Sequence, residues 1–430
     1  MKVLLVGGGG REAALAWAFS RSPLLTELTC APGNAGIARH ARLVPIAADD
    51  VPALVAHAVS RAYDLVVVGP EAPLVSGLAD RLREAGIDVF GPSAAAAAIE
   101  GSKAFSKEFM ARHRIPTAAF QVFDEPVAAS RYLLSPDTVY PLVVKADGLA
   151  AGKGVVIADD AETADLAASS MLSGQAFGSA GRRVVVEEML RGRETSFFVL
   201  TDGKTTLPLA SCQDYKRVGD GDLGPNTGGM GTYSPSAWLD EATEKTLLAS
   251  VVAPTVSGLA AEGRPFSGVL FIGVMLTASG PKVLEYNARF GDPETQVLIP
   301  RLDGDWLEVI AACARGTLAD VVLRWRPEAA VCVVLASHGY PGSYPTGLPI
   351  EGLNDAEPRD GVMIFHAGTA LSAAGRVTTA SGRVLGVTAT GRDLAAARNR
   401  AYEAVARIGF QGEHHRTDIA ADAIDGTGTA

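Results

Sequence analysis

Three polar side chains at every second position near residue 287 could hold a metal ion and a phosphoryl group. Glu285, Asn287 and Arg289 would project together, because alternate residues of a β-strand share a face. Leu284 and Tyr286 would then enter a core. Carboxylate and amide oxygens suit Mg²⁺, and a guanidinium suits a transferring phosphoryl group or an acyl phosphate. The pattern therefore predicts a metal and phosphoryl site.

A ladder of surface ion pairs would show the same alternation. The chain continues from Arg289, however, into the turn Phe290-Gly291-Asp292-Pro293-Glu294, which carries two further acids. Apolar runs flank this region, as expected for a site carried by buried strands. The functional interpretation is favoured, and Asp292 joins Arg289 as a candidate catalytic residue.

A glycine-rich turn near the N-terminus could bind phosphate. Residues 7–12 (Gly-Gly-Gly-Gly-Arg-Glu) lie between an apolar strand and a helical pattern, where backbone N–H groups and the helix dipole favour an anion. A dinucleotide fingerprint would place a third glycine at Glu12 and an acid after the next strand, and neither is present, so NAD is rejected. Gly9, Gly10, Arg11 and Glu12 remain candidates for a phosphate-bearing substrate. A tight turn without a ligand is the alternative.

Residues 145–154 combine lysines and glycines between two apolar runs. They do not form a Walker loop, which needs four residues between its glycines and Ser or Thr after the lysine. A glycine-rich hairpin can instead fold over a triphosphate, whose charge amides and ammonium groups neutralise. The candidates for ATP binding are Lys145, Gly148, Gly152, Lys153 and Gly154. A plain flexible hairpin is the alternative.

A buried-strand pattern ends at Glu187 and Glu188, with Leu190 and Glu194 beyond it. An apolar slot suits adenine, and carboxylates suit an amino group or ribose hydroxyls. A strand that ends in two glutamates is more often a solvated edge, so this signal is weak alone.

A long polar loop occupies residues 213–233. It holds Asp214 and Lys216 among paired charges, and then the run Asn226-Thr227-Gly228-Gly229. Closely spaced glycines let a backbone approach a ligand, whereas a disordered linker would more often be rich in Ser or Glu. We expect a substrate loop.

The elements that would position these residues begin with repeated strand–turn–helix units in residues 1–100. Such units build a parallel sheet with ligands at the carboxyl ends of its strands. A helix is expected from Ala94 through Lys107, ended by Pro116. Strands around a helix at Ala161–Leu172 indicate a small α+β module. Helices are expected at residues 241–262 and 306–315, and the last hundred residues resemble a separate β-plus-helix cap.

Composition excludes several classes of protein. The 430 residues, 48% of them hydrophobic, predict two to four domains with ample cores. The formal charge of −10 and the lack of a Lys/Arg run argue against nucleic-acid binding. The four cysteines form no CxxC pair, which suggests a reducing, cytoplasmic location. The apolar stretches at residues 3–6 and 265–281 are too short or too interrupted for a signal peptide or a membrane span.

Taken together, these runs resemble the ATP-grasp superfamily and, within it, the phosphoribosylamine–glycine ligase family. The resemblance spans nearly the whole chain and is most specific in residues 224–231 and 285–294. It implies an α/β protein with four parts. These are an N-terminal parallel-sheet domain (1–102), an ATP-grasp α+β core (103–122 and 190–325), a small mobile lid (123–189) and a C-terminal mixed β/α domain (326–430).

The resemblance also implies a reaction. An ATP-dependent carbon–nitrogen ligase of purine biosynthesis would join glycine to 5-phosphoribosylamine through glycyl phosphate, releasing ADP and phosphate. Glu285 and Asn287 would hold Mg²⁺ (or Mn²⁺), and Arg289 would steady the acyl phosphate. We expect a cytoplasmic monomer.

The remaining site residues follow from the same resemblance. Lys103 and Lys145 would contact ATP phosphates, and Asp214 is a further catalytic candidate. The nucleoside would lie against Glu187, Glu188, Leu190 and Glu194. The two substrates would share, in an undetermined division, Gly9, Gly10, Arg11, Glu12, Gly33, Asn34, Pro70, Glu71, Lys216, Asn226, Thr227, Gly228 and Gly229.

The chain departs from the family pattern at three positions. Ala13 and Tyr215 stand where the family usually has His, and Ala94 stands where it commonly has Lys. No carboxylate occurs between Gly268 and Lys282, where many ATP-grasp proteins place another metal ligand. Metal binding would therefore depend more heavily on the two ligands named above.

Two other functions remain possible on this scaffold. One is another ATP-grasp ligase, such as a carboxylase subunit or a formate-dependent transformylase, against which the 213–233 loop argues. The other is a non-catalytic nucleotide sensor, which would be expected to lose Glu285, Asn287 or Arg289, and all three are present.

Overall fold

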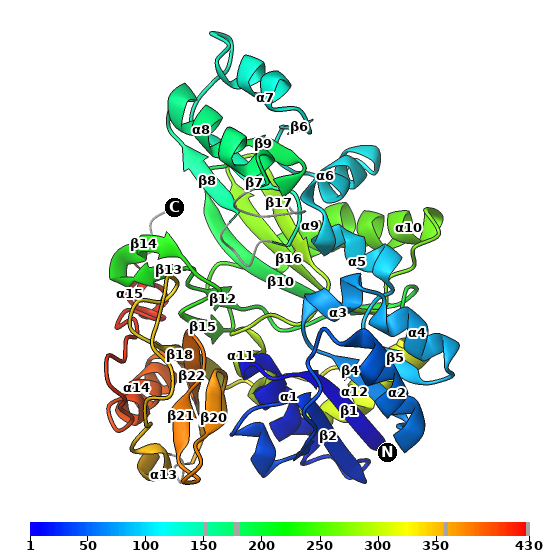
Figure 1. Ribbon diagram of the computed structural model, residues 1–430, viewed down its shortest axis with the longest axis vertical. Coiled ribbons are helices and arrows are strands. Elements are labelled where there is room, and N and C mark those ends of the chain that lie inside the picture. Colours follow the sequence, from blue (N-terminus) through cyan, green and yellow to red (C-terminus); the bar gives the residue numbers. More distant parts are fainter. Residues whose placement is uncertain (150–153, 175–180, 357–359, 427–430) are drawn as a thin grey trace.

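The computed structural model describes residues 1–149, 154–174, 181–356 and 360–426. Its N-terminal part is a five-stranded parallel sheet (Figure 1). The central strand β1 (Lys2–Gly7) is buried on both faces, with Val3 and Leu5 in one core cluster and Leu4 and Val6 in another. The strand order is β3 (Arg42–Leu43), β2 (Glu27–Pro32), β1, β4 (Leu65–Val68), β5 (Asp88–Phe90). The helices are α1 (Gly10–Phe19), α2 (Val51–Arg61), α3 (Glu71–Val75), α4 (Leu78–Glu84) and α5 (Ala94–Gly101).

A small domain at the top of Figure 1 has its own sheet and its own core. Its antiparallel strands run in the order β6 (Phe120–Phe123), β9 (Val184–Glu188), β7 (Leu142–Ala146), β8 (Val155–Ala158). They pack with α7 (Pro126–Leu133) and α8 (Ala161–Leu172). Apolar side chains such as Leu133, Val144 and Met171 bury each other in a cluster distinct from the other three.

The central sheet is antiparallel, in the order β11 (Thr206–Pro208), β10 (Arg193–Thr201), β16 (Gly268–Thr277), β17 (Gly280–Asn287). The register of β17 slips at Leu284, which forms a β-bulge between Val283 and Glu285. The bulge shifts the alternation of side chains. Val283 and Tyr286 are therefore both buried, whereas Leu284 is half-buried and Glu285 is exposed. The prediction that Leu284 enters the core is wrong, and the prediction for Tyr286 is confirmed.

Helices surround this sheet. They are α6 (Lys103–Arg112), α9 (Glu241–Leu247), α10 (Ala253–Ala261) and α12 (Trp306–Arg315), with a π-helical turn at Leu248–Val252 between α9 and α10. The single helix expected from Ala94 through Lys107 is instead two, α5 and α6. Ser102 separates them because its backbone is extended (φ −141°, ψ 114°) and its hydroxyl accepts the Phe105 N–H as the cap of α6.

The C-terminal sheet is completed by strands from the polar loop. Its order is β12 (Gln213–Asp214), β15 (Gly231–Ser234), β18 (Ala329–Ala336), β22 (Arg383–Gly391), β19 (Val362–His366), with α14 (Leu394–Val405) against β18 and β22. The sheet of the last hundred residues therefore also includes strands of the polar loop, because β15 pairs directly with β18. The loop itself forms the hairpin β13 (Arg217–Gly219) and β14 (Leu223–Asn226).

Smaller elements complete the described chain. They are the hairpin β20 (Thr369–Leu371) and β21 (Val377–Thr379), and the short helices α11 (Thr295–Leu298), α13 (Leu353–Ala356) and α15 (Ala421–Asp425). None of the described helices combines the length and the apolar character that crossing a bilayer requires.

Candidate active site

Glu285 is an anionic group surrounded by cations. Although Glu285 is accessible to solvent, the surrounding protein partly desolvates its carboxyl group and would raise its pKa, but Lys216, Lys145, Lys103 and Arg289 hold that pKa below its ordinary value. These cations come from the polar loop, the lid sheet, α6 and the segment after β17. The arrangement concentrates positive charge around one accessible carboxylate, which is a setting that a polyphosphate and its metal ion would fit.

Asn287 and Arg289 face the same side as predicted. The Arg289 Nη2 donates to the Asn287 Oδ1 at 3.0 Å, although Arg289 itself lies beyond the end of β17. Arg289 also contacts the carboxylates of Glu71 at 3.2 Å and Glu100 at 3.0 Å. Burial would lower the pKa of Arg289, but these two carboxylates raise it above its ordinary value. The guanidinium is thus a permanent cation, held by these three side chains and by the Phe290 carbonyl.

Glu100 was not among the predicted site residues. Its second carboxylate oxygen accepts the Ala288 N–H at 2.6 Å, so it also fixes the backbone between Asn287 and Arg289. Burial raises its pKa to about 7. Its place in the sequence, three residues before the predicted phosphate ligand Lys103, was the available signal.

Two side chains at the end of β17 suit a divalent cation. Glu285 offers a carboxylate and Asn287 an amide oxygen, the donors that Mg²⁺ accepts. The Asn287 amide nitrogen is buried without a hydrogen-bond partner among the described residues. Within residues 1–149, 154–174, 181–356 and 360–426, no group of three or more His, Cys, Asp or Glu side chains could hold a metal. The residues fit an ion that takes its remaining ligands from phosphate and water.

Lys145 belongs to a buried ion-pair triad. Its Nζ lies 3.0 Å from the Glu187 Oε1, and the Nζ of Lys107 lies 2.8 Å from the Glu187 Oε2. Lys107 also donates to the Thr117 hydroxyl at 2.7 Å. Glu187 is therefore neutralised by two lysines rather than open to a nucleoside. Sequence reasoning missed Lys107 as a partner, although it lies four residues after Lys103 on the same helix.

The other nucleoside candidates have different partners. Glu188 accepts from Lys282 at 3.0 Å and from the Ala119 N–H at 3.1 Å. Glu194 instead interacts electrostatically with Lys216 and with the acids near it, and burial raises its pKa. Leu190 is half-buried.

The lid hairpin is anchored to α6 through one carboxylate. The Asp147 Oδ1 accepts from the Ser102 hydroxyl at 2.8 Å and from the Ala104 N–H at 2.7 Å, while its Oδ2 accepts from the Arg183 Nε at 3.0 Å. Lys103 donates to the carbonyl of Gly148 at 3.1 Å. These bonds place two predicted phosphate ligands, Lys103 and the hairpin backbone, side by side.

Two residues of that hairpin, Gly152 and Lys153, lie outside the described residues. Gly154 accepts the Ala146 N–H at 2.8 Å and so closes the described part of the hairpin.

Two backbone N–H groups of the N-terminal glycine turn donate hydrogen bonds to side-chain carboxylates. The Gly9 N–H donates to the Glu12 Oε2 at 2.6 Å, and the Arg11 N–H donates to the Asp292 Oδ2 at 3.1 Å. The Arg11 side chain is 7% exposed and donates to Glu12 and to the Phe290 carbonyl. The charge of Arg11 is therefore already neutralised by Glu12 inside the protein, and its role as a phosphate partner stays a prediction.

Glu12 also explains the glycines around it. A Cβ at Gly69 would lie 1.9 Å from the Glu12 Oε1, and one at Gly7 2.6 Å from its Cδ. Gly10 would meet the Gln296 Nε2 at 2.5 Å. These glycines make room for packed side chains.

Asn34, a predicted substrate residue, connects the N-terminal and C-terminal parts of the molecule. Its amide nitrogen donates to the carbonyls of Gly8 at 2.9 Å and His366 at 2.7 Å, and its oxygen accepts two backbone N–H groups. All its polar groups are engaged by backbone. Gly33 donates to the Gly7 carbonyl at 3.0 Å with a left-handed φ of +72°. Pro70 precedes the first residue of α3.

Asp292 is a structural junction. Its carboxylate accepts from the Gln296 amide at 2.9 Å as well as from the Arg11 N–H, and it lies 3.6 Å from the Arg383 Nη1. Burial would raise its pKa, but Arg383 and Arg11 hold the pKa below its ordinary value. With its oxygens engaged in this way, Asp292 is placed to position the turn rather than to react.

Asp214 and Lys216 form a close pair in the polar loop. The Lys216 Nζ lies 2.5 Å from the Asp214 Oδ2 and 3.9 Å from the Glu294 Oε1. Ser196 donates to the Asp214 Oδ1 at 3.2 Å. The polar loop thus reaches Glu294 in the turn that follows β17.

The glycine run of the loop is held from the C-terminal sheet. The Arg383 Nη1 donates to the carbonyls of Gly228 at 2.7 Å and Asp292 at 2.5 Å, and the Gly228 N–H donates to the Tyr340 hydroxyl at 3.1 Å. The Thr227 hydroxyl accepts the Gly229 N–H at 2.9 Å. Asn226 is exposed and pairs with Arg217 in the β13–β14 hairpin. No local pattern identified Arg383, because its partners lie about 90 to 150 residues away.

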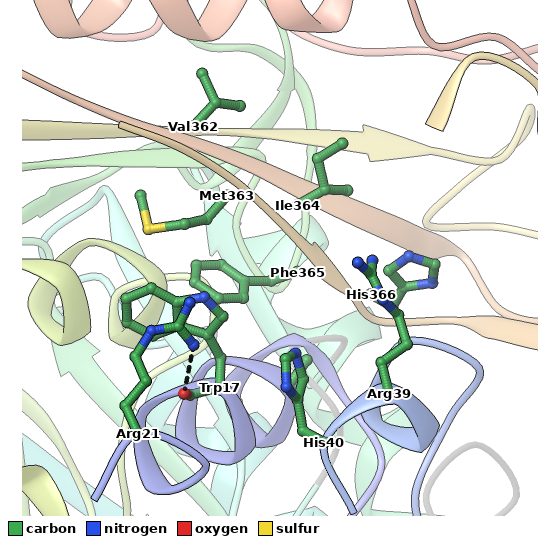
Figure 2. A pocket seen from close by; sticks show the side chains of 11 residues that line it. Trp17, Arg21, Arg39, His40, Val362, Met363, Ile364, Phe365 and His366 are labelled. Atoms are coloured by element: carbon green, nitrogen blue, oxygen red, sulfur yellow. Dashed lines mark hydrogen bonds between the residues drawn. The ribbon is translucent and has the colours of Figure 1, made fainter. Parts of the chain in front are cut away.

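Two of the departures from the family pattern have structural roles. The Tyr215 hydroxyl donates to Asp422 and accepts the Ala420 N–H at 2.9 Å, so it binds the C-terminal segment. Ala13 lines a cavity of about 210 Å³ between α1 and β19, which Figure 2 shows with Trp17, Arg21 and Phe365. None of the lining residues is among the charged groups around Glu285.

Comparisons with known proteins cover the whole chain. The three domain models of the phosphoribosylglycinamide synthetase family match it: the N domain at residues 1–100, the ATP-grasp (A) domain at 101–295 and the C domain at 330–422. The phosphoribosylamine–glycine ligases of Brucella melitensis and Salmonella typhi are 52% and 49% identical to it, each over 99% of both chains. The crystal structure of the Thermotoga maritima phosphoribosylamine–glycine ligase superposes with a TM-score of 0.85 at 34% identity, covering 98% of this chain and 100% of that one. A biotin carboxylase from Campylobacter jejuni shares the fold alone, at 15% identity and a TM-score of 0.75.

Proposed function

The chain belongs to the phosphoribosylglycinamide synthetase family, and from that premise we propose that ATP, glycine and 5-phosphoribosylamine meet around Glu285 and Arg289. The protein is an enzyme, an ATP-dependent carbon–nitrogen ligase that ligates glycine in purine biosynthesis. The observation that carries the placement is the Arg289 guanidinium, which contacts the Asn287 amide oxygen at 3.0 Å and is fixed by Glu71 and Glu100 beside the Glu285 carboxylate.

In the first step, a carboxylate oxygen of glycine attacks the γ-phosphorus of ATP. The bond from that phosphorus to the bridging oxygen of ADP breaks, and glycyl phosphate forms. Lys103 and Lys145 stabilise negative charge on the phosphates. Arg289 is fixed by Glu71 and Glu100 and stabilises the phosphoryl group during its transfer. When bound, Mg²⁺ or Mn²⁺ would be held by Glu285 and Asn287 and would neutralise phosphate charge.

In the second step, the amine of 5-phosphoribosylamine attacks the acyl carbon. The carbon–oxygen bond to phosphate breaks, and the amine loses one proton as glycinamide ribonucleotide and phosphate form. The polar loop, positioned by Arg383, supports the amine substrate through Asn226, Thr227, Gly228 and Gly229. Gly9, Gly10, Gly33 and Pro70 form the nearby backbone on the N-terminal side.

ADP release tests this function. With 5-phosphoribosylamine formed in situ from ribose 5-phosphate and ammonia, we expect ADP release to require glycine and to match the glycine consumed. ADP release that does not respond to glycine would overturn the substrate assignment.

Glu285→Gln tests the metal assignment. The change removes a charge but little volume, so we expect intact unfolding behaviour, turnover lowered by at least about 100-fold, and weaker Mn²⁺ binding measured by electron paramagnetic resonance. Glu308→Gln, an exposed glutamate on α12, is the matched control. Normal Mn²⁺ affinity in Glu285→Gln would show that the ligand is elsewhere.

We also propose that the enzyme acts as a cytoplasmic monomer. Its four cysteines are buried and free, as a reducing compartment requires. Light scattering coupled to size exclusion gives the mass of the native particle and would reveal a dimer directly.

A further inference from the structure

Glu294 is a buried carboxylate with an unused acceptor. The residue is 2% exposed, and its Oε1 accepts no hydrogen bond among the described residues. The nearest cation recorded for that oxygen is the Lys216 Nζ at 3.9 Å, which is too far for a hydrogen bond. Lys216 is instead drawn to Asp214, at 2.5 Å. Burial and the neighbouring Asp214 raise the pKa of the Glu294 carboxyl group to about 7, so a cationic donor at the empty acceptor would stabilise the ionised form.

The acids around Lys216 outnumber its one positive charge. Burial would lower the pKa of Lys216, but Asp214, Glu294, Glu194 and Glu285 together raise it. The other cations nearby are already paired. Arg289, which also interacts with Glu294, contacts Glu71 and Glu100, and Lys145 contacts Glu187. The side formed by Asp214 and Glu294 is therefore short of positive charge.

Glycine carries a negative and a positive charge, and the two sides of such a site would bind one each. At neutral pH it is a zwitterion, and its ammonium group lies only two bonds from the carboxylate carbon. If the carboxylate points toward the phosphoryl group and Arg289, the ammonium must lie within a few ångströms. Keeping that nitrogen protonated also stops it from attacking glycyl phosphate, because an ammonium group has no lone pair.

We propose that Glu294 binds the α-ammonium group of glycine, beside the Asp214–Lys216 pair, and so selects an amino acid over other small carboxylates. The inference rests on the proposed function. It assigns to Glu294 a direct substrate contact, whereas Asp214 acts by positioning Lys216.

The test compares glycine with glycolate, which replaces the ammonium group by a hydroxyl group. In the wild type we expect a strong preference for glycine in substrate-dependent ADP release. In Glu294→Gln we expect the KM for glycine to rise by about 10- to 100-fold, as for the loss of a hydrogen bond to a charged group. The KM for ATP should stay within about twofold, and the glycine-to-glycolate preference should collapse.

Controls separate the possible failures. Glu308→Gln should behave as the wild type. Glu294→Asp keeps the charge on a shorter side chain and should give an intermediate KM for glycine. This variant also tests the proposal if Glu294→Gln does not fold. An unchanged glycine KM and an unchanged preference in both Glu294 variants would overturn the proposal. A wild type that ignores glycine altogether would instead overturn the proposed function.

Discussion

At the scale of single residues, ion pairing decides which predicted groups are available to ligands. Glu285, Asn287 and Arg289 could be predicted from their spacing, because a strand fixes which side chains share a face. The ion-pair partners could not, since folding brings Glu71 and Glu100 to Arg289 and brings Lys107 to Glu187. Arg11 is a similar case. Its sequence context suggested that it binds phosphate, but folding pairs its guanidinium with Glu12.

Lys107 offers a prediction about stability. Replacing it in Lys107→Met leaves one oxygen of the buried Glu187 without a donor, so we expect the free energy of unfolding to fall by about 1–3 kcal/mol. Urea unfolding measures this value, and Lys245→Met, which removes an exposed pair with Glu241, is the control. A loss no larger than in the control would mean that the triad contributes little.

The pH dependence of that loss has a definite sign. Burial lowers the pKa of Lys107 from 10.5 to about 8. Between these values the unfolded chain binds more protons than the folded chain, so Lys107 makes the folded state more stable as pH rises. The difference between wild type and Lys107→Met should therefore widen from pH 8 to pH 10. A difference that narrows would contradict the assignment.

At the scale of elements, periodic segments were predictable and interruptions were not. The helices Ala161–Leu172 and Trp306–Arg315 match their predicted bounds, because each has a clear apolar face and a capping Asp. The break at Ser102 and the bulge at Leu284 depend on distant hydrogen bonds and on strand register. Both interruptions lie beside candidate site residues.

Asp147→Asn tests the anchor between the lid and α6. Losing the charge weakens the bonds to Ser102 and Arg183, so we expect the KM for ATP to rise by about 10-fold, in line with one charge-assisted hydrogen bond. Amide exchange should increase in β7 and at the start of α6. Asp160→Asn, which keeps a capping side chain on α8 of the same domain, is the control. An unchanged KM for ATP would show that the anchor made by Asp147 does not support ATP binding.

At the scale of the whole molecule, the candidate site is assembled from every domain. Helix α3 of the N-terminal domain supplies Glu71, the lid Lys145, the central sheet Glu285, and the C-terminal sheet Arg383. The α/β class followed from the repeated strand–helix patterns, and composition predicted a range of two to four domains. The pairing of β15 with β18, which ties the polar loop to the C-terminal sheet, joins residues about 100 positions apart and left no local signal.

Arg383→Ala tests the contribution of the C-terminal sheet. Without its bonds to Gly228 and Asp292, the loop and the turn lose their common support, and we expect kcat/KM for glycine to fall by about 100-fold. Arg392→Ala, at a side chain that is 89% exposed, is the control. Wild-type kinetics in Arg383→Ala would show that the loop is held by other contacts.

The central claim is that glycine is activated as glycyl phosphate at this site. Carboxyl-labelled ¹⁸O glycine follows the atoms directly, because the oxygen that attacks phosphorus leaves with phosphate in the second step. Mass spectrometry of the inorganic phosphate should find one ¹⁸O atom for each glycinamide ribonucleotide formed. Phosphate without ¹⁸O, released while glycine is consumed, would contradict the account.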